Sequence, residues 1–474
     1  MAEPRKQLHV AMFPWLAFGH MLPYLELANL MAKRGHKISF LSTPRNIQRL
    51  PNPPPELAPL IKFVPLPLPP VDGLPDEAEA TTDLQPHQVP YLKTAYDGLQ
   101  ESMAQLLEAS SLDWIIYDFA PHWLPPVASR LGISRACFSI FNAWTIAFLG
   151  QSSSAMIEGI DPRTEREHFT VPPPWIPFPS KVAFQLHEVR RYMGDHVNGN
   201  SSGVTDIARF GYAIAGSDVV AIRSCSEMEG DFLRLVGELH GKPTFPVGLL
   251  PPSVSGGDAP LDNSWLTIRE WLDKQSKGSV VYIAFGSENT LSQAELTELA
   301  MGLELSGVPF FWVLLRKQHK LAELPAGFEE RVKGRGVVWT SWAPQLRVLA
   351  HDSVGGFLTH NGWSSIIEGL YFGRVLLMLP FSIDQGLNAR VLGEQKVGVE
   401  VPKDDEDGSF TRDSVAKSLK LVLVDEEGAV FRGKAKQMSK LVGDRDLQHQ
   451  YVDKFIEFLI SQRLSVQNLN NIRL

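Results

Sequence analysis

Short apolar runs recur along both halves of the chain, and each is followed by a stretch with helical spacing. In the first half these runs include Gln7–His20, His36–Ser42, Asp113–Phe119 and Arg135–Ile140. In the second half they include Ser279–Glu288, Pro309–Leu315, Gly336–Ser341, Val354–Thr359 and Val375–Pro380. Continuous apolar runs of this length are typical of parallel strands buried on both faces. The alternation therefore predicts an α/β protein with two doubly wound, Rossmann-like domains.

A segment rich in Pro and Gly, Gly241–Pro260, separates the two halves and predicts a linker. The chain of 474 residues also exceeds the ~250 to 300 residues at which a single core stops growing. We therefore expect an N-terminal domain over residues 1–240 and a C-terminal domain over residues 261–445, facing each other across a cleft. Residues 446–474 begin with a predicted helix. Two Pro-rich stretches, Pro51–Pro90 and Pro172–Pro179, predict ordered loops that either line a site or only connect elements.

Composition and charge exclude several classes of protein. The net charge of −8 and the lack of a basic stripe argue against binding to nucleic acid. Only Cys137 and Cys225 occur, which is typical of a protein from a reducing compartment. No apolar run approaches the ~20 residues of a membrane span, and the first residues lead directly into a strand. We expect a cytoplasmic protein without a membrane span.

The stretch Trp342–Gln385 carries side chains suited to holding a nucleotide-activated sugar. Its centre, His360–Ser365, forms the predicted turn between the strand Val354–Thr359 and the helix Ser364–Phe372. A helix N-terminus offers unpaired N–H donors and a partial positive charge, which favour a diphosphate. Trp342 is a candidate for stacking on a base. Gln345 and Glu368 are candidates for the ribose hydroxyls, and Asp384 and Gln385 for the sugar hydroxyls.

Simpler interpretations remain open for each of these residues taken alone. Ser365 and Glu368, three positions apart at a helix start, also fit a capping box. Trp342 and Trp363 are each, singly, more typical of a core than of a binding platform. A lone His360 is usually a helix cap or a satisfied core residue.

The ordered set of residues resembles a known family. Trp342, Gln345, His360, Gly362, Trp363, Ser365, Glu368, Asp384 and Gln385 match, without a gap, the signature box of plant family-1 UDP-sugar glycosyltransferases, which have the GT-B fold. Two positions depart from the pattern, because Asn361 stands where Cys is common and Ser364 where Asn is usual. The family's Asn contacts phosphate, so we expect weaker donor affinity without loss of activity. The resemblance adds Ala343 and Ser287 to the implied donor-binding residues, and it implies that the helix after residue 446 packs on the N-terminal domain.

The resemblance also implies a catalytic pair, His20 and Asp118. His20 follows the first strand and Asp118 follows the strand at Asp113–Phe119. From the residues alone, His20 is better interpreted as a helix cap. The match of Phe13–Ala28 to the first turn of the family implies instead that His20 deprotonates an acceptor hydroxyl, while Asp118 orients the imidazole. The implied reaction is a one-step inverting displacement without a metal or other cofactor, and we expect a monomer.

The detail Trp15, Ala17, Phe18, Gly19 and His20 resembles the branch of this family that adds a sugar to the sugar of a flavonoid, terpenoid or steroid glycoside. Gln385 fits a gluco-configured donor in that family. UDP-glucose is therefore the expected donor, with UDP-rhamnose as the alternative. An apolar acceptor requires aromatic walls, and the candidates that follow first-half strands are Phe119, Trp123, Phe141 and Trp144.

Four other functions are weighed against this one. A metal-dependent glycosyltransferase requires an Asp-x-Asp site, but Asp405, Glu406 and Asp407 indicate a solvated turn beside Gly408. A nucleotide-sugar epimerase would require no acceptor. A nicotinamide oxidoreductase calls for GxGxxG after a strand, which is absent. A non-catalytic UDP-sugar-binding protein would have no need for His20 and Asp118.

Overall fold

The computed structural model describes residues 7–192, 202–252, 263–286, 289, 291–315 and 323–472. These residues form two compact units. Unit 1 contains the described residues of 1–164, 192–250 and 445–474, and unit 2 those of 165–191 and 251–444. Each unit is therefore built from separate stretches of the chain.

Unit 1 is built on a parallel sheet with the strand order β3-β2-β1-β4-β5-β6-β7. Its strands are β1 His9–Phe13, β2 Lys37–Ser42, β3 Ile61–Pro65, β4 Trp114–Tyr117, β5 Ser134–Ser139, β6 Val219–Ile222 and β7 Thr244–Pro246. Its helices are α1 Phe18–Lys33, α2 Pro44–Arg49, α3 Val89–Asp97, α4 Gln100–Glu108, α5 Leu124–Arg130, α6 Ala143–Leu149, α7 Ser153–Glu158, α9 Asp206–Ala215, α10 Ser226–His240 and α19 Arg445–Ile472. The central strands β4 and β6 are buried along their whole length, as continuous apolar runs require.

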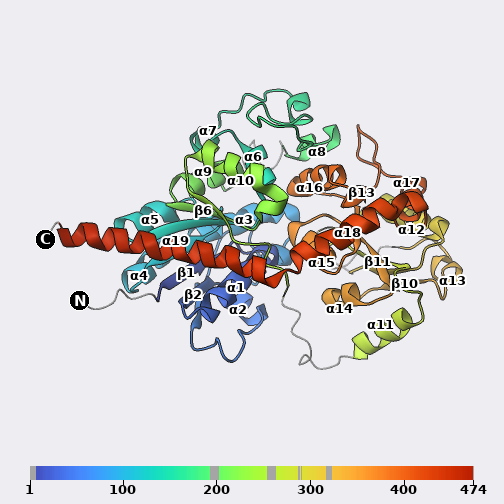
Figure 1. Ribbon diagram of the computed structural model, residues 1–474, viewed down its shortest axis with the longest axis horizontal. Coiled ribbons are helices and arrows are strands. Elements are labelled where there is room, and N and C mark those ends of the chain that lie inside the picture. The colour runs from blue at the N-terminus through green and yellow to red at the C-terminus, as the bar shows by residue number, and fades with distance from the viewer. Residues whose placement is uncertain are drawn as a thin grey trace. The chain divides into compact units, whose positions relative to one another are not determined.

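The long helix α19 belongs to unit 1 although it follows all of unit 2 in the sequence (Figure 1). It contacts α1 and β7. Val452, Phe455, Ile456 and Leu459 are part of the same hydrophobic core as β1 and β4. The Trp114 indole N–H also donates a hydrogen bond to the Leu459 carbonyl (3.2 Å).

Unit 2 contains a second parallel sheet, with the strand order β10-β9-β8-β11-β12-β13. Its strands are β8 Val280–Ala284, β9 Phe310–Val313, β10 Gly336–Trp339, β11 Val354–Thr359, β12 Val375–Met378 and β13 Gly398–Glu400. Its helices are α11 Asn263–Asp273, α12 Gln293–Ser306, α13 Phe328–Arg331, α14 Gln345–Ala350, α15 Trp363–Tyr371, α16 Ile383–Glu394, α17 Arg412–Leu423 and α18 Ala429–Val442, and α8 Leu186–Tyr192 begins in this unit. The two doubly wound sheets confirm the predicted fold class.

Two segments that we predicted to be irregular contain strands. Thr244–Pro246, inside the predicted linker, pairs with β6, and Ile61–Pro65, inside the Pro-rich stretch Pro51–Pro90, pairs with β2. Both are edge strands, where a proline leaves no ladder bond unmade. The rest of the predicted linker from residue 253 to 260 lies outside the described residues. Residues 165–191 belong to unit 2, whereas we had expected them in the N-terminal domain.

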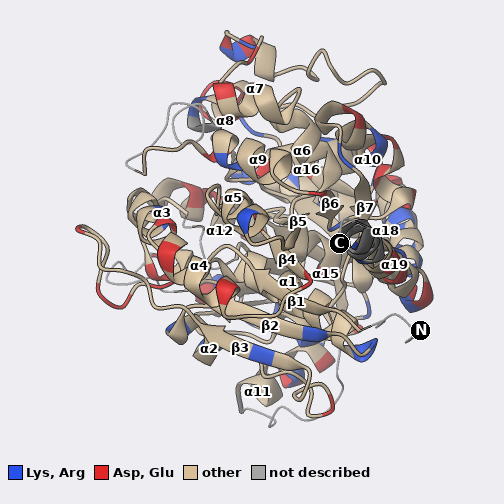
Figure 2. Cartoon of the chain, turned by 90° about the vertical axis from the view of Figure 1, so that its left-hand side faces the viewer, with Lys and Arg blue, Asp and Glu red and all other residues tan. Residues whose placement is uncertain are grey.

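Figure 2 shows Lys and Arg in blue and Asp and Glu in red, with segments of both colours scattered along the chain. None of the helices in the described ranges is both long enough and apolar enough to cross a bilayer.

Candidate active site

The order of strands in unit 1 reverses between β1 and β4, and ligands of doubly wound sheets bind outside the carboxyl ends of strands at such a point. Phe13, the last residue of β1, pairs with Tyr117, the last residue of β4. His20 lies in the first turn of α1, just after β1, and Asp118 follows β4 directly. Sheet topology therefore brings together two residues that are 98 positions apart in the sequence.

His20 and Asp118 form a close, buried pair. The His20 Nδ1 and Asp118 Oδ2 atoms are 2.6 Å apart, and the two residues are 8% and 1% exposed. Asp118 also accepts hydrogen bonds from the backbone N–H groups of Trp15 (3.1 Å) and Phe119 (2.7 Å). Since a carboxylate only accepts, Nδ1 carries the proton, and Nε2 of the neutral ring is left as a hydrogen-bond acceptor. This is the arrangement that a general base requires.

Aromatic rings surround the imidazole of His20. Phe119 and Phe141 have ring centroids 5.8 and 5.5 Å from it. Phe210 of α9 stacks on Phe119 at 4.6 Å, and sequence reasoning missed it because no motif marks this helix. The other two predicted acceptor residues have different surroundings: Trp144 is fully buried against Phe232, whereas Trp123 is 7% exposed, as is Phe119. Residue type alone could not distinguish pocket aromatics from core aromatics.

The negative charge of Asp118 affects the pKa of two buried tyrosines, Tyr24 and Tyr96. Burial, and secondarily the Asp118 carboxylate, raise the pKa of Tyr24 and Tyr96 well above the usual range. Both hydroxyl groups therefore stay protonated and donate hydrogen bonds, Tyr24 to the Phe138 carbonyl (2.8 Å) and Tyr96 to the Pro14 carbonyl (3.1 Å). Tyr96 thereby fixes the segment between β1 and α1 that leads to His20.

Unit 2 has an equivalent reversal of strand order between β8 and β11, and His360 follows β11 there. The ring of His360 lies between two glycines. A Cβ atom on Gly362 would be 2.6 Å from its Nε2, and one on Gly286 would be 3.0 Å from its Cε1. Burial lowers the pKa of His360 to about 4. At neutral pH the ring is therefore uncharged and offers one N–H donor.

The turn after His360 leads into α15, whose first residue is Trp363. Asn361 has a left-handed φ of 67°, and in the described part of the chain neither atom of its buried amide finds a hydrogen-bond partner. The backbone carbonyl of Asn361 accepts a hydrogen bond from the side-chain amide of Asn388 (3.0 Å), which also donates to the Asp384 carboxylate (3.1 Å). Asn388, which sequence reasoning missed, therefore connects the turn to α16.

Four of the predicted donor-site residues lie on α15: Trp363, Ser364, Ser365 and Glu368. Trp363 is 3% exposed, so the core interpretation of its side chain is confirmed, and its backbone lies in the first turn of the helix. The capping-box interpretation of Ser365 and Glu368 is wrong, because Gly362 is the N-cap residue and no side chain caps the helix. Ser364 and Ser365 are half-buried in the first turn, where the N–H groups of a helix have no carbonyl partner within the helix itself.

Trp342, Gln345 and Glu368 form the other side of the predicted donor site. Trp342 is 71% exposed, so its core interpretation is wrong, whereas Ala343 beside it is buried. Gln345 donates a hydrogen bond from its amide to the Glu368 carboxylate and accepts one from the Tyr282 hydroxyl (3.3 Å). The amide and the carboxylate predicted for the ribose thus lie together, although 23 residues separate them.

Gln385 has a structural role that the sequence did not reveal. Its Oε1 accepts hydrogen bonds from the Phe381 and Ser382 N–H groups (2.9 and 3.0 Å), and its Nε2 donates to the Ser382 hydroxyl (2.7 Å). It is 7% exposed and closes a capping box at the start of α16. Only its second amide hydrogen is left for a ligand.

Ser287 lies outside the described residues. In the acidic turn, Asp404 accepts hydrogen bonds from the Glu406 and Asp407 N–H groups (2.9 and 3.3 Å), as expected of a solvated turn. Within the ranges that the structure covers, no three His, Cys, Asp or Glu side chains are grouped so that they could hold a metal ion.

Comparisons with known proteins identify relatives of this chain. A family model described as "UDP-glucoronosyl and UDP-glucosyl transferase" matches residues 234–461. UDP-glycosyltransferase 91D2 of Stevia rebaudiana is 50% identical over 463 residues, which cover 97% of this chain and 96% of that protein. UDP-glycosyltransferase 91C1 of Arabidopsis thaliana is 51% identical over 98% of this chain and 99% of its own length.

The fold is similar to solved structures at low sequence identity. The crystal structure of Glycyrrhiza uralensis UGT73P12, complexed with glycyrrhetinic acid 3-O-monoglucuronide, has a TM-score of 0.80 at 23% identity and 98% coverage of both chains. Medicago truncatula UGT71G1, complexed with UDP-glucose, has a TM-score of 0.77 at 24% identity, covering 97% of this chain and 100% of that chain. This likeness concerns the GT-B fold. Together with the close relatives, it shows that the chain belongs to the plant family-1 UDP-glycosyltransferases, enzymes that transfer a sugar from a UDP-sugar to a small-molecule acceptor.

Proposed function

We propose that this enzyme transfers glucose from UDP-glucose to a hydroxyl group on the sugar of a plant glycoside. Two relatives are named for acceptors that already carry sugar. Soyasaponin III rhamnosyltransferase of Glycine max is 43% identical over 97% of this chain, and anthocyanidin-3-O-glucoside rhamnosyltransferase of Petunia hybrida is 35% identical over 96%. These names support a glycoside as the acceptor.

The 2.6 Å contact between His20 and Asp118 carries the mechanistic part of the proposal. His20 Nε2 takes the proton from the acceptor hydroxyl while that oxygen attacks the anomeric carbon of the donor. The bond between this carbon and the diphosphate oxygen breaks at the same time, its electron pair leaves with UDP, and the anomeric configuration inverts. Asp118 stabilises the imidazolium that forms. General-base assistance of this kind typically contributes ~10² to 10⁴-fold in rate.

The departing diphosphate is stabilised by the start of α15, without a metal ion. The N–H groups at the start of this helix, which have no carbonyl partner within the helix, and the uncharged His360 ring supply hydrogen-bond donors. The exposed face of Trp342 stacks on the uracil ring, and the Gln345–Glu368 pair binds the ribose. The reaction requires the donor held by unit 2 to reach His20 of unit 1.

UDP-rhamnose is the second candidate donor, and two observations favour it. The relatives with named glycoside acceptors are rhamnosyltransferases. Moreover, Gln385, on which the preference for glucose depends, is largely engaged in capping α16. We also propose that the enzyme acts as a monomer in the cytoplasm, which the two buried free cysteines support.

The proposal is tested with the variants His20→Ala and Asp118→Asn and with both donors on a panel of plant glycosides. Mass spectrometry of the products distinguishes the gain of a hexose from the gain of a deoxyhexose. We expect His20→Ala to lose transfer and to keep UDP affinity, measured by calorimetry, close to that of the wild type. Wild-type turnover in this variant would remove His20 from the mechanism. Loss of activity with a strong chelator would refute the metal-free step.

A further inference from the structure

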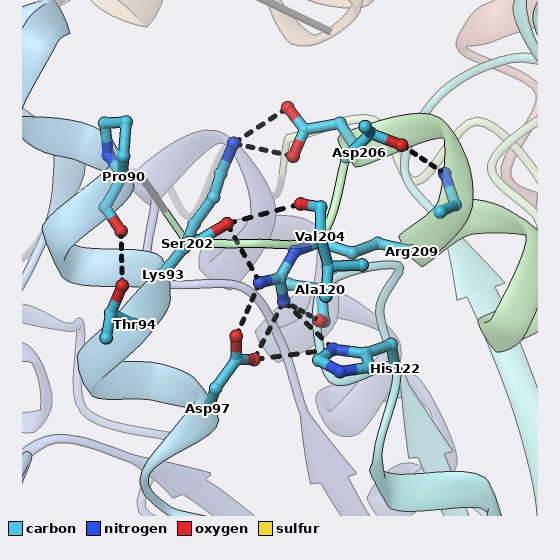
Figure 3. Close-up of polar contacts among 12 residues, drawn as sticks. Pro90, Lys93, Thr94, Asp97, Ala120, His122, Ser202, Val204, Asp206 and Arg209 are labelled. Carbon is cyan, nitrogen blue, oxygen red and sulfur yellow. Dashed lines mark hydrogen bonds and ion pairs between the residues drawn. The ribbon is translucent and has the colours of Figure 1, made fainter. Parts of the chain in front are cut away.

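Two ion pairs, one buried and one partly buried, join helices α3 and α9 in unit 1 (Figure 3). Lys93 Nζ binds both carboxylate oxygens of Asp206 (2.6 and 2.8 Å). One turn further along α3, Asp97 binds both terminal nitrogens of Arg209 (2.8 and 2.5 Å). On α3 the cation precedes the anion, and on α9 the anion precedes the cation. The two pairs therefore fix both the spacing and the register of α9 on α3.

Only one of the two cations is seen to bind the loop that carries the catalytic carboxylate. We call residues 118–122, which follow β4, the β4 loop. Arg209 donates a hydrogen bond to the Ala120 carbonyl (2.7 Å) and lies 3.2 Å from Nδ1 of His122, as Figure 3 shows. Arg209 is fully buried, so these contacts are sheltered from water. The Lys93 ammonium is bound by Asp206 instead.

The residue after Arg209 touches the same loop from the side of the imidazole. Phe210 stacks on Phe119 with a centroid distance of 4.6 Å and an interplanar angle of 14°. Phe119 follows Asp118 directly and donates its backbone N–H to the Asp118 carboxylate. Phe210 also packs edge-on against Phe141, whose ring lies 5.5 Å from that of His20. Consecutive residues of α9 thus hold the β4 loop by a hydrogen bond and by a stacked ring.

We propose that Arg209 and Phe210 are positioning residues, which hold the β4 loop so that Asp118 stays aligned with His20. This inference rests on the proposed role of His20 and Asp118 and extends it to α9. A guanidinium is suited to the task, because its planar fork binds a carboxylate through two nitrogens and still has a donor for a carbonyl. A lysine has a single nitrogen and cannot keep this geometry. A misplacement of about 1 Å in a catalytic group can cost on the order of a hundredfold in rate.

The Lys93–Asp206 pair provides a control, because it joins the same two helices and is at least as buried as the Asp97–Arg209 pair, whose carboxylate is partly exposed. The double variant Arg209→Gln/Asp97→Asn removes one pair without leaving an unpaired charge, and Lys93→Gln/Asp206→Asn removes the other in the same way. Both should lower the melting temperature by a similar amount. Only the first should lower kcat, by about tenfold or more, while the KM for the UDP-sugar stays unchanged.

A double-mutant cycle then distinguishes positioning from a general loss of packing. Arg209→Lys should reduce kcat in the wild-type background and cause little further loss in the Asp118→Asn background, because Arg209 acts through Asp118. Should the neutral double variant fail to fold, Arg209→Lys and the milder Phe210→Leu carry the same test.

Three outcomes overturn the inference: an equal kcat in the two neutral double variants, equal losses in both backgrounds of the cycle, or wild-type kcat in folded Arg209→Lys and Phe210→Leu. The proposed function is tested separately by His20→Ala. If that variant is inactive while the α9 variants are fully active, only the positioning role fails. If His20→Ala keeps its activity, the proposed mechanism fails as well.

Discussion

Glu229 is a buried carboxyl group that should make unit 1 less stable as the pH rises. It is 1% exposed and lies where α10 is kinked, with φ −136° and ψ 22°. The kink lets its side chain accept hydrogen bonds from the N–H groups of Ala143 (2.8 Å) and Trp144 (3.2 Å), at the start of α6, and from the Ser224 hydroxyl. These donors only partly offset burial, which raises its pKa from 4.5 to about 8.

The size of the effect follows from the two pKa values. In the unfolded chain the carboxyl ionises near pH 4.5, whereas in the folded chain it keeps its proton until about pH 8. Below pH 4.5 this group therefore does not lower the free energy of unfolding. Between pH 4.5 and pH 8 it lowers that free energy progressively as the pH rises. At about 1.4 kcal/mol per pH unit, the free energy of unfolding should fall by roughly 3 kcal/mol between pH 5 and pH 8.

The variant Glu229→Gln isolates this contribution, because its amide oxygen still accepts from both N–H groups and its amide nitrogen can donate to Ser224. Urea unfolding of the wild type and the variant at pH 5, 6, 7 and 8 measures the difference in stability. We expect this difference to shift by roughly 3 kcal/mol in favour of the variant from pH 5 to pH 8. Glu158→Gln, at an exposed position in the same unit, should show no such trend. If the stabilities of Glu229→Gln and the wild type change in parallel with pH, the reasoning is refuted, and the carboxylate is satisfied by its three donors.

Three further predictions concern unit 2. Trp342→Ala should weaken UDP binding, measured by calorimetry, by about 1 to 3 kcal/mol. The melting temperature should not fall, since Trp342 is exposed. Unchanged affinity would show that Trp342 does not stack on the uracil ring. Gly386→Ala should raise the KM for the UDP-sugar, because the added Cβ would lie 2.4 Å from the carboxylate of Glu188, which pairs with Arg390 on α16. Gly393→Ala on the same helix is the control, because its Cβ would meet its nearest atom only at 3.9 Å. Equal KM values for the two variants would contradict the clash. Asn361→Gly should be more stable than Asn361→Ala by about 1 kcal/mol in thermal unfolding, because the left-handed φ disfavours a Cβ; equal stabilities would show that the turn relaxes.

The central strands could be predicted from the sequence, because burial on both faces leaves a continuous apolar run such as that of β4. The edge strand β7 could not, since Thr244–Pro246 is short, pairs on one side only and is flanked by Pro and Gly. A local sequence pattern therefore indicates whether a strand is buried better than it indicates which strand it pairs with.

The site was predictable where a motif fixes the position of a residue in the turn after a strand, as for His20 and His360. Residues on helices were missed because their roles depend on tertiary contacts that no spacing records. Phe210 and Asn388 are examples, since each is recognised only by what it touches. Side-chain exposure was equally hidden, and Trp342 and Trp144 have opposite environments despite being the same residue type.

The place of α19 in the core of unit 1 has a consequence for the synthesis of the protein. Trp114 and Leu459 are hydrogen-bonded partners 345 residues apart, and residues 251–444 of unit 2 are translated between β7 and α19. At 5 to 20 residues per second, the ribosome needs on the order of tens of seconds to cover that distance. For that time the nascent sheet lacks Val452, Phe455 and Ile456, and its uncovered apolar patch is available to chaperones or to aggregation. Substitutions in this helix should therefore reduce the yield of folded enzyme more than its turnover.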